Sequence, residues 1–324
     1  MGRLEPAVAA GRRAVRENLV EVAPGQAVIA GVSGGADSLA LAATLAFVGP
    51  RAGWDVRVVV VDHRLQDGSG EVAATAARQC RDLGLAAEVV AVEVGQSGGP
   101  EAAARAARLQ ALHEAAHRHD AAAICLAHTL DDQAETVLLG LGRGSGPRSI
   151  AAMAPRSGLL HRPFLGLRRR DTLAICAAHD LAPWDDPHNT DPAYRRVRVR
   201  RELLPLAEDV LGGGVAEALA RTAGQVARDL DLLDALTDDW LAAHPDPDRV
   251  ADLAAQHPAI RSRVLRRLAL AAGAASGELA QGHIDALGSL LDNPRGGRRV
   301  ELPGGLTCTR EGDRLIFAPT PVAR

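Results

Sequence analysis

A glycine-rich loop near the start of the sequence has the residue types of a phosphate-binding site. The loop, Val32–Ser38 (VSGGADS), follows the apolar run 27–30 and precedes an apolar segment, 39–48, that contains neither Gly nor Pro. That order predicts a strand, a tight turn and a helix. Such a turn directs backbone N–H groups and a helix N-terminus at one spot, which suits phosphate or diphosphate. The loop therefore predicts nucleotide binding; the alternative is a turn that Asp37 caps and that binds nothing.

Asp37 also indicates which ion accompanies the nucleotide. A carboxylate inside a phosphate-binding loop repels its ligand unless a divalent cation lies between them, so Asp37 predicts Mg²⁺. In the segment 131–136 (DDQAET), Asp132 and Glu135 are three residues apart and share one face of a predicted helix. Acidic residues that merely cap this helix are the alternative. Beside a nucleotide, the three carboxylates predict a site for Mg²⁺ and for a second, cationic substrate.

The elements expected to position these residues alternate between strands and helices. Apolar runs typical of strands occupy 27–32, 56–61, 88–94 and 121–127, and helical stretches occupy 38–48, 70–83, 100–119 and 131–141. This alternation predicts a doubly wound parallel α/β sheet, whose ligands bind at the carboxyl ends of the strands. The glycine loop, the segment 62–65 (DHRL) and the segment 128–132 (HTLDD) each follow a strand, so we expect them to converge on one edge. There His128 would contact the nucleotide or stabilise a leaving group, unless its role is structural.

The length, net charge, lysine content and cysteine spacing of the chain exclude several functional classes. The chain has 324 residues, enough for a sizeable core and two domains, and its formal net charge is −3. It contains no lysine, which excludes a Walker A lysine, a Schiff-base lysine and an adenylated lysine. Widely separated cysteines favour reduced thiols over a metal cluster; they are Cys80, Cys125, Cys176 and Cys308. With no signal-like N-terminus and no apolar run long enough to cross a bilayer, we expect a soluble, cytoplasmic protein.

The segment 143–201 is basic although the chain as a whole is acidic. It contains twelve Arg and five Asp, an excess of seven positive charges. Clustered Arg with interposed glycines favours contact with a phosphate backbone, so the segment predicts RNA binding; a solvated basic face is the alternative. Aromatic residues make up only 2% of the chain, so base stacking is not expected to be the main source of affinity.

The run of three glycines at 212–214 predicts a linker. Beyond it, three ranges have helical spacing: 215–243, 250–272 and 282–291. The tail, 298–317, has the pattern of short strands joined by turns. We therefore expect a catalytic domain at 1–211 that includes the RNA-binding segment 143–205, and a mainly α-helical accessory domain with a short β tail at 215–324.

Taken together, these motifs resemble a known family. The glycine loop resembles the signature of the N-type ATP pyrophosphatases (the PP-loop superfamily), which cleave ATP between its α- and β-phosphates. Among these, the chain is similar to the tRNA(Ile)-lysidine synthase family, and the most specific match is DDQAET followed by RGSG at 143–146. Further matching segments occur in the family's order across 31–205, about half of the chain: 61–65, 101–108, 162–165, 186–189 and 196–205.

The resemblance implies a reaction and its partners. ATP would activate the 2-keto oxygen of the wobble cytidine in tRNA(Ile) with the anticodon CAU. The ε-amine of free L-lysine would then displace AMP, forming lysidine and changing decoding from AUG to AUA and identity from Met to Ile. The implied fold is adenine nucleotide alpha-hydrolase-like, the implied ion is Mg²⁺, and the resemblance is compatible with a homodimer.

The resemblance also implies roles for individual residues. Asp37 and Asp132 would hold Mg²⁺, and Asp132 and Glu135 would orient the lysine amine and help to remove its proton. Arg108 would neutralise the α-phosphate, unless it is a helix-surface charge. The residues implied for ATP binding are Ser33, Gly34, Gly35, Ala36, Asp37, Ser38, His63 and His128. Those implied for tRNA binding are Arg143, Arg162, Arg196, Arg198, Arg200 and Arg201.

Three other functions share parts of this pattern. A tRNA cytidine thiolase would need cysteines placed for a cluster or a persulfide. A small-molecule amidotransferase, such as a GMP or NAD synthetase, would need a glutaminase domain or a supply of ammonia. A non-catalytic nucleotide sensor or RNA-binding module would not need Asp37, Asp132 and Glu135 together.

Overall fold

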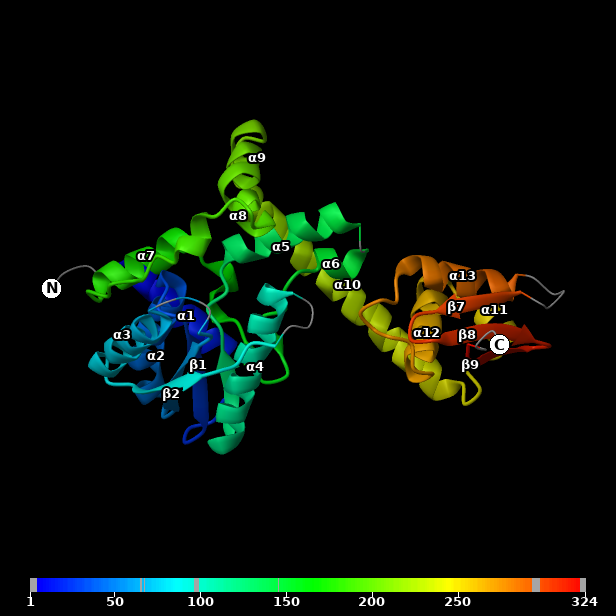
Figure 1. Cartoon of the computed structure of the whole chain (residues 1–324), viewed down its shortest axis with the longest axis horizontal. Coiled ribbons are helices and arrows are strands. Elements are labelled where there is room, and N and C mark those ends of the chain that lie inside the picture. Colours follow the sequence, from blue (N-terminus) through cyan, green and yellow to red (C-terminus); the bar gives the residue numbers. More distant parts are fainter. Residues whose placement is uncertain are drawn as a thin grey trace. The chain divides into compact units, whose positions relative to one another are not determined.

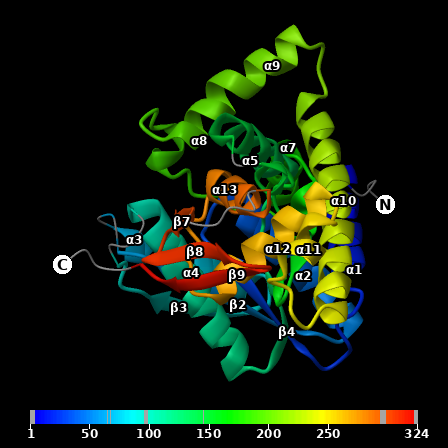
Figure 2. The same cartoon turned by 90° about the vertical axis from the view of Figure 1, so that its right-hand side faces the viewer.

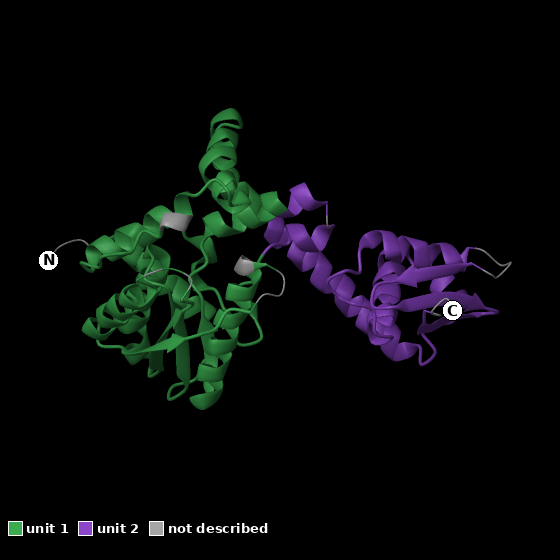
Figure 3. Ribbon diagram, in the orientation of Figure 1, with its two compact units in different colours: residues 1–139, 153–221 green, residues 140–152, 222–324 purple. Residues whose placement is uncertain are grey.

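The computed structural model describes residues 5–64, 66, 68–95, 99–144, 146–292 and 298–320. The chain divides into two compact units (Figure 3): unit 1 contains residues 1–139 and 153–221, and unit 2 contains residues 140–152 and 222–324. Two helices, α5 (Leu130–Arg143) and α10 (Val215–Ala243), begin in unit 1 and end in unit 2. The domain division expected near residues 211–215 stays a prediction.

Unit 1 is built on a mainly parallel sheet (Figure 1). Its described strands are β1 (Ala27–Val32), β2 (Asp55–Asp62), β3 (Ala86–Ala91), β4 (Ala121–Cys125), β5 (Arg156–Ser157) and β6 (Leu160–His161). They lie in the order β3-β2-β1-β4-β6-β5, and only the β5–β6 pair is antiparallel among them. The predicted doubly wound α/β sheet is confirmed. The strands β5 and β6 are too short for a sequence pattern to indicate.

Helices cover both faces of this sheet because its strands are apolar on both sides. The helices are α1 (Pro6–Asn18), α2 (Ala36–Ala52), α3 (Ser69–Asp82), α4 (Pro100–Arg118) and α7 (Arg169–Ala178). Successive side chains of a strand point to opposite faces. Accordingly, Val28 and Ala30 of β1 join one core with α1, α2, α3 and α7, whereas Ile29 joins a second core with Leu112 of α4. The strand ends are thereby held rigidly at one edge.

The arginine-rich segment packs onto α5. After the sheet come the short helices η1 (Pro163–Gly166), η2 (Pro187–Thr190), α8 (Arg195–Arg198), η3 (Val199–Leu203) and α9 (Leu204–Val210). Leu130 and Ala134 of α5 form a small core with Leu204 and with Ala216, in the first turn of α10. This core fixes the chain around residues 195–204 against the helix that carries the acidic pair.

Unit 2 combines helices with a three-stranded antiparallel sheet in the order β7-β8-β9 (Figures 1 and 2). Its remaining described elements are α6 (Pro147–Ile150), α11 (Val250–Ala254), α12 (Pro258–Ala271), α13 (Gln281–Leu291), β7 (Arg299–Leu302), β8 (Leu306–Glu311) and β9 (Arg314–Pro319). The expected β tail is confirmed. A single helix at 250–272 is wrong: Pro258 has no N–H to continue a helix, and it begins α12 instead. No described helix is long and apolar enough to span a membrane.

Candidate active site

The glycine loop joins the carboxyl end of β1 to the start of α2. Gly34 has φ +86°, which residues with a Cβ rarely adopt, and a Cβ there would lie 3.3 Å from the Cβ of Ala76. The buried Ser38 Oγ accepts a hydrogen bond from the Ser33 N–H (3.1 Å) and lies 2.9 Å from the Gly35 carbonyl, to which it donates. The loop is therefore preorganised around the first N–H groups of α2, which can hold phosphate oxygens.

Asp37, in the first turn of α2, is held by helix α7. Its Oδ1 accepts a hydrogen bond from Thr172 Oγ1 (2.5 Å), and its Oδ2 accepts one from Arg169 Nη1 (3.0 Å). Burial raises the pKa of Asp37; Thr172 and Arg169 oppose this shift, and the nearby charge of Asp132 adds to it. The roles of Thr172 and Arg169 were not predicted, because nothing local in the run 168–172 indicates which strand end α7 approaches.

Asp132 and Glu135 of α5 both bind arginine. Glu135 has no exposed surface; its Oε2 accepts a hydrogen bond from Arg196 Nε (2.9 Å) and its Oε1 accepts one from Arg200 Nε (2.5 Å). Arg200 Nη2 also lies 3.3 Å from Asp132 Oδ1, so both carboxylates face the same side of α5. The backbone N–H of Thr129 donates to the other Asp132 oxygen (2.8 Å), as in a helix cap. Burial lowers the pKa of Arg200, but Glu135 and Asp132 outweigh it, so the pKa is raised.

The arginines predicted to contact tRNA occupy three environments. Two of them lie in the acidic site: Arg196 and Arg200. Three are exposed: Arg143, Arg198 and Arg201. Arg162 is buried at the sheet edge, with 7% of its surface exposed. Some motif positions lie outside the described residues, namely Leu65, Ser145 and the side chains of Pro187 and His188.

Two histidines and an arginine form the other half of the site. His63 follows β2, His128 follows β4, and Arg108 lies on α4. Burial and the charge of Arg108 lower the pKa of His63. Burial lowers the pKa of His128 to about 4, although the charge of Asp132 opposes the shift. Nδ1 of both histidines and Nε of Arg108 are buried and have no hydrogen-bond partner among the described residues. Neutral imidazoles beside an unpaired guanidinium suit an anionic ligand.

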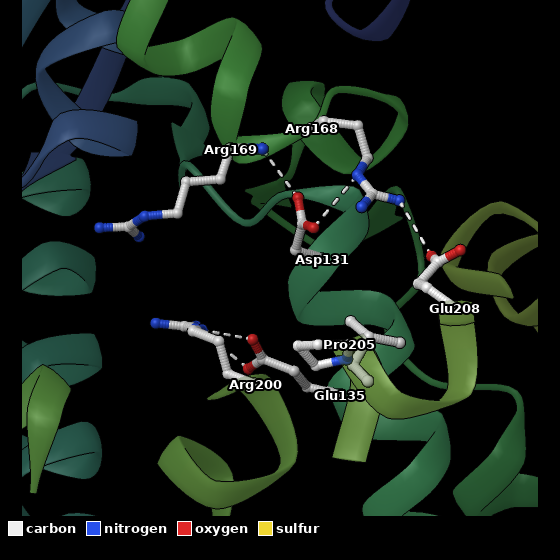
Figure 4. A pocket seen from close by; sticks show the side chains of 8 residues that line it. Asp131, Glu135, Arg168, Arg169, Arg200, Pro205 and Glu208 are labelled. Atoms are coloured by element: carbon white, nitrogen blue, oxygen red, sulfur yellow. Dashed lines mark hydrogen bonds and ion pairs between the residues drawn. The ribbon is translucent and has the colours of Figure 1, made fainter. Parts of the chain in front are cut away.

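A small pocket of mixed charge adjoins Glu135 (Figure 4). Its volume is about 170 Å³, and it is lined by Asp131, Glu135, Arg168, Arg169, Arg200, Leu204, Pro205 and Glu208. Asp131 accepts a hydrogen bond from the Arg169 backbone N–H (2.7 Å) and lies 3.1 Å from Arg168 Nε. The charges of the walls are paired with one another, Arg168 with Asp131 and Arg200 with Glu135, so a zwitterionic amino acid would bind here by exchanging its own charges into these pairs.

Metal ligands are sparse in the part of the chain that the structure describes. No group of three or more His, Cys, Asp or Glu side chains there is arranged to hold a metal ion. Besides burial, the charge of Asp132 raises the pKa of Asp37, so the two carboxylates lie within electrostatic range of each other. Two carboxylates suit Mg²⁺, which commonly binds through one or two of them together with waters and substrate phosphates. The donor set fits this ion when nucleotide phosphates complete it.

Similarity to known proteins covers nearly the whole chain. Residues 11–207 match the PP-loop domain, and residues 249–316 match the TilS substrate binding domain. The chain is 50% identical to the tRNA(Ile)-lysidine synthase of Thermobifida fusca (strain YX) over 97% of this chain and 98% of that protein. It is also 50% identical to the tRNA(Ile)-lysidine synthase of Salinispora arenicola (strain CNS-205), over 100% of both chains.

Among solved structures, the chain is similar to the U34-tRNA thiolase NcsA from Methanococcus maripaludis with its [4Fe-4S] cluster. The TM-score is 0.58 at 17% identity, with 68% of this chain and 79% of that chain covered. At this identity the likeness shows the fold alone.

Proposed function

This chain belongs to the tRNA(Ile)-lysidine synthase family, and on that premise we propose that it joins L-lysine to the wobble cytidine of the CAU anticodon of tRNA(Ile). It is a carbon–nitrogen ligase that cleaves ATP to AMP and diphosphate, and its product, lysidine, changes decoding from AUG to AUA. One observation carries the assignment of the site: Asp37, Asp132 and His128 converge at the carboxyl edge of the sheet, beside a loop shaped for phosphate.

In the first half-reaction, the 2-keto oxygen of the cytidine attacks the α-phosphorus of ATP and diphosphate leaves. The N–H groups of the glycine loop bind the diphosphate. Arg108 neutralises charge on the α-phosphate, and His128, which is neutral at pH 7, donates a hydrogen bond without adding charge. Asp37 and Asp132 would hold Mg²⁺, which offsets the charge of the phosphates when it is bound.

In the second half-reaction, the ε-amine of lysine attacks C2 of the adenylated cytidine and AMP leaves. The ammonium must first lose its proton, and we assign its removal to Asp132. Both Glu135 oxygens already bind arginine, so we assign to Glu135 the positioning of Arg200 and, through it, of Asp132. The mixed-charge pocket would hold the amino acid, with its α-carboxylate against Arg168.

The exposed arginines and the substrate binding domain are proposed to hold the tRNA. In unit 1, Arg198 and Arg201 are available to phosphates, and in unit 2 Arg143 is. All four cysteines are free and buried, which offers no exposed thiol for a thiolase reaction and suits a reducing compartment. We therefore place the enzyme in the cytoplasm, and we include a homodimer on the strength of the family resemblance alone.

The test is lysine transfer to RNA. The full chain is incubated with ATP, Mg²⁺, labelled lysine and either tRNA(Ile) or tRNA(Met), both with the anticodon CAU. We expect label in tRNA(Ile) alone. The rate of lysine transfer should fall about 100-fold or more in Asp132→Asn, because one oxyanion or base contact contributes on that order. The control Asp209→Asn, whose side chain is exposed on α9, should keep the wild-type rate. Full activity of Asp132→Asn, or equal labelling of tRNA(Met), would overturn the proposal.

A further inference from the structure

Arg162 is a buried guanidinium that has no carboxylate partner in the part of the chain that the structure describes. It directly follows β6, and 7% of its surface is exposed. Its Nη1 donates to the Ala154 carbonyl (2.8 Å), whereas its Nε is buried and has no hydrogen-bond partner among the described residues. A buried charge is costly unless an opposite charge accompanies it. Among the residues described, none supplies an anion that compensates the charge of Arg162.

The charge that acts on Arg162 is that of another arginine, Arg105. Arg105 and Arg108 are three residues apart on α4 and so share one face of that helix. Burial lowers the pKa of Arg162, and the charge of Arg105 lowers it further. After burial and Asp132, the largest influences on the pKa of His128 are the charges of Arg108, Arg162 and Arg105. Arg105 and Arg108 of α4 and Arg162 at the end of β6 therefore lie within electrostatic range of His128, as does Asp132.

The sheet places this cluster one step beyond the nucleotide loop. Strands β4 and β6 are parallel neighbours, and the Leu126 N–H donates to the His161 carbonyl (2.8 Å), so Arg162 lies at the same edge as His128. The glycine loop follows β1, on the opposite side of β4. Neighbouring strands are about 4.8 Å apart, so the ends of β1 and β6 are separated by about 10 Å. A phosphate at Arg162 is therefore not the one that the glycine loop holds.

We propose that Arg162 and Arg105 form a second phosphate-binding site, which holds a backbone phosphodiester of the RNA next to the reacting cytidine. Arg105 is exposed and Arg162 is buried, so the pair leads from the surface to the edge where Arg108 and His128 lie. A polynucleotide carries regularly spaced phosphates and can fill such a path while its base enters the site. The identity of the RNA rests on the proposed function; the phosphate chemistry rests on the cluster itself.

The test distinguishes binding of an RNA phosphate at this site from binding of a nucleotide phosphate. Binding of an anticodon stem-loop RNA with a CAU loop is measured with the full chain at several salt concentrations, and binding of α,β-methylene-ATP is measured without RNA. For Arg162→Gln we expect RNA affinity to fall about tenfold or more and the salt dependence to lose about one phosphate contact. Affinity for the ATP analogue should not change. Arg162→Lys, which keeps the charge, should retain the salt slope, and the control Arg118→Gln, at the far end of α4 and paired with Glu88, should change neither ligand's binding.

Three results would overturn the proposal. The first is that Arg162→Gln leaves the salt dependence of RNA binding unchanged but lowers the midpoint of urea unfolding. Arg162 would then serve only to bind the Ala154 carbonyl. The second is a loss of nucleotide affinity equal to the loss of RNA affinity, and the third is unchanged RNA binding. If Arg162→Gln does not fold, Arg105→Gln, an exposed position, decides alone through its salt slope. If the wild-type protein transfers no lysine but the arginine variants still change the salt dependence of RNA binding, the proposed reaction is wrong and the proposed phosphate site is supported.

Discussion

Charge at the catalytic edge is divided between two kinds of residue. The three site carboxylates are paired: Asp37 with Arg169, Asp132 with Arg200, and Glu135 with Arg196 and Arg200. By contrast, Arg108 and the two strand-end histidines have buried nitrogens without partners among the described residues. An uncompensated buried charge on Arg108 and unpaired buried nitrogens on the neutral histidines are both unfavourable, so phosphate binding stabilises this second group. Pairing these groups with phosphates therefore contributes to the free energy of ligand binding.

Removal of Glu135 should destabilise the fold as well as the reaction. Glu135→Ala would leave Arg196 and Arg200 without their buried partner, and breaking such a pair costs about 3 kcal/mol. Urea unfolding of the variant should show a loss of this order. Glu135→Gln, which keeps an acceptor oxygen, should lose less. An Ala variant as stable as the wild type would mean that the two arginines find other partners.

The low pKa of His128 predicts acid-labile stability. In the folded chain the pKa is about 4 and its ordinary value is 6.5, so the unfolded state binds more protons between these pH values. Stability should fall as pH drops from 7 to 4.5, and His128 would contribute up to about 3 kcal/mol of the full loss below pH 4. Urea unfolding of His128→Asn should be less pH-dependent than that of the wild type. The exposed His117→Asn is the control, and an identical pH dependence of all three proteins would contradict this account.

Among the elements, α5 connects the chemistry to the rest of the chain. Its first turns carry Asp132 and Glu135, and near its end Ser149 of the following segment approaches Gly140 closely. At Gly140 an added Cβ would lie 2.3 Å from the Ser149 carbonyl oxygen, whereas at Gly142 it would meet nothing within 4 Å. Both glycines are in α5, but only Gly140 is required by a close approach of neighbouring backbone.

These two glycines give a matched pair of variants. Gly140→Ala forces backbone to move and should destabilise unit 2 by about 2 kcal/mol. Gly142→Ala, an exposed helix position, should stabilise by about 0.5–1 kcal/mol because Ala has the higher helix propensity. Thermal unfolding of both variants measures the difference. Equal effects would show that the approach of Ser149 to α5 does not constrain the helix.

At the scale of the whole molecule, the two units have separate cores. Val28, Leu41 and Phe164 belong to the core on one face of the unit 1 sheet, and Leu265 and Leu287 belong to the core of unit 2. The proposed ATP site lies entirely in residues of unit 1. Nucleotide binding should therefore stabilise unit 1 more than unit 2.

Buried cysteines report on each unit. Burial raises the thiol pKa of Cys125, in unit 1, and of Cys308, in unit 2, to about 12, so both need unfolding to react. ATP at 100 times its Kd adds about 2.7 kcal/mol of stability to the state that binds it. Thiol labelling followed by mass spectrometry should show Cys125 protected roughly 100-fold by ATP and Cys308 unchanged. Equal protection of both thiols would mean that the units unfold together.

Much of the fold follows from local sequence. The apolar runs and the intervening helices specify a parallel sheet, and the glycine at position 34 specifies a turn with positive φ. Because parallel strands end at one edge, the order of the elements also determines that the glycine loop, His63 and His128 approach one another. These features depend on neighbours in the chain, so a sequence pattern contains them.

Only the tertiary structure decided which arginine serves which purpose. Within 143–201 the twelve arginines are chemically alike, yet Arg200 binds Glu135 across 65 residues and Arg169 binds Asp37 across 132. Arg162 is buried with no carboxylate partner among the described residues, and Arg198 is exposed. A guanidinium's partner is set by packing between elements that are distant in sequence, and a local pattern carries no information about that distance. The sequence thus determined the chemistry of the edge, and the packing of α5, α7 and the segment 195–204 determined how its charges are paired.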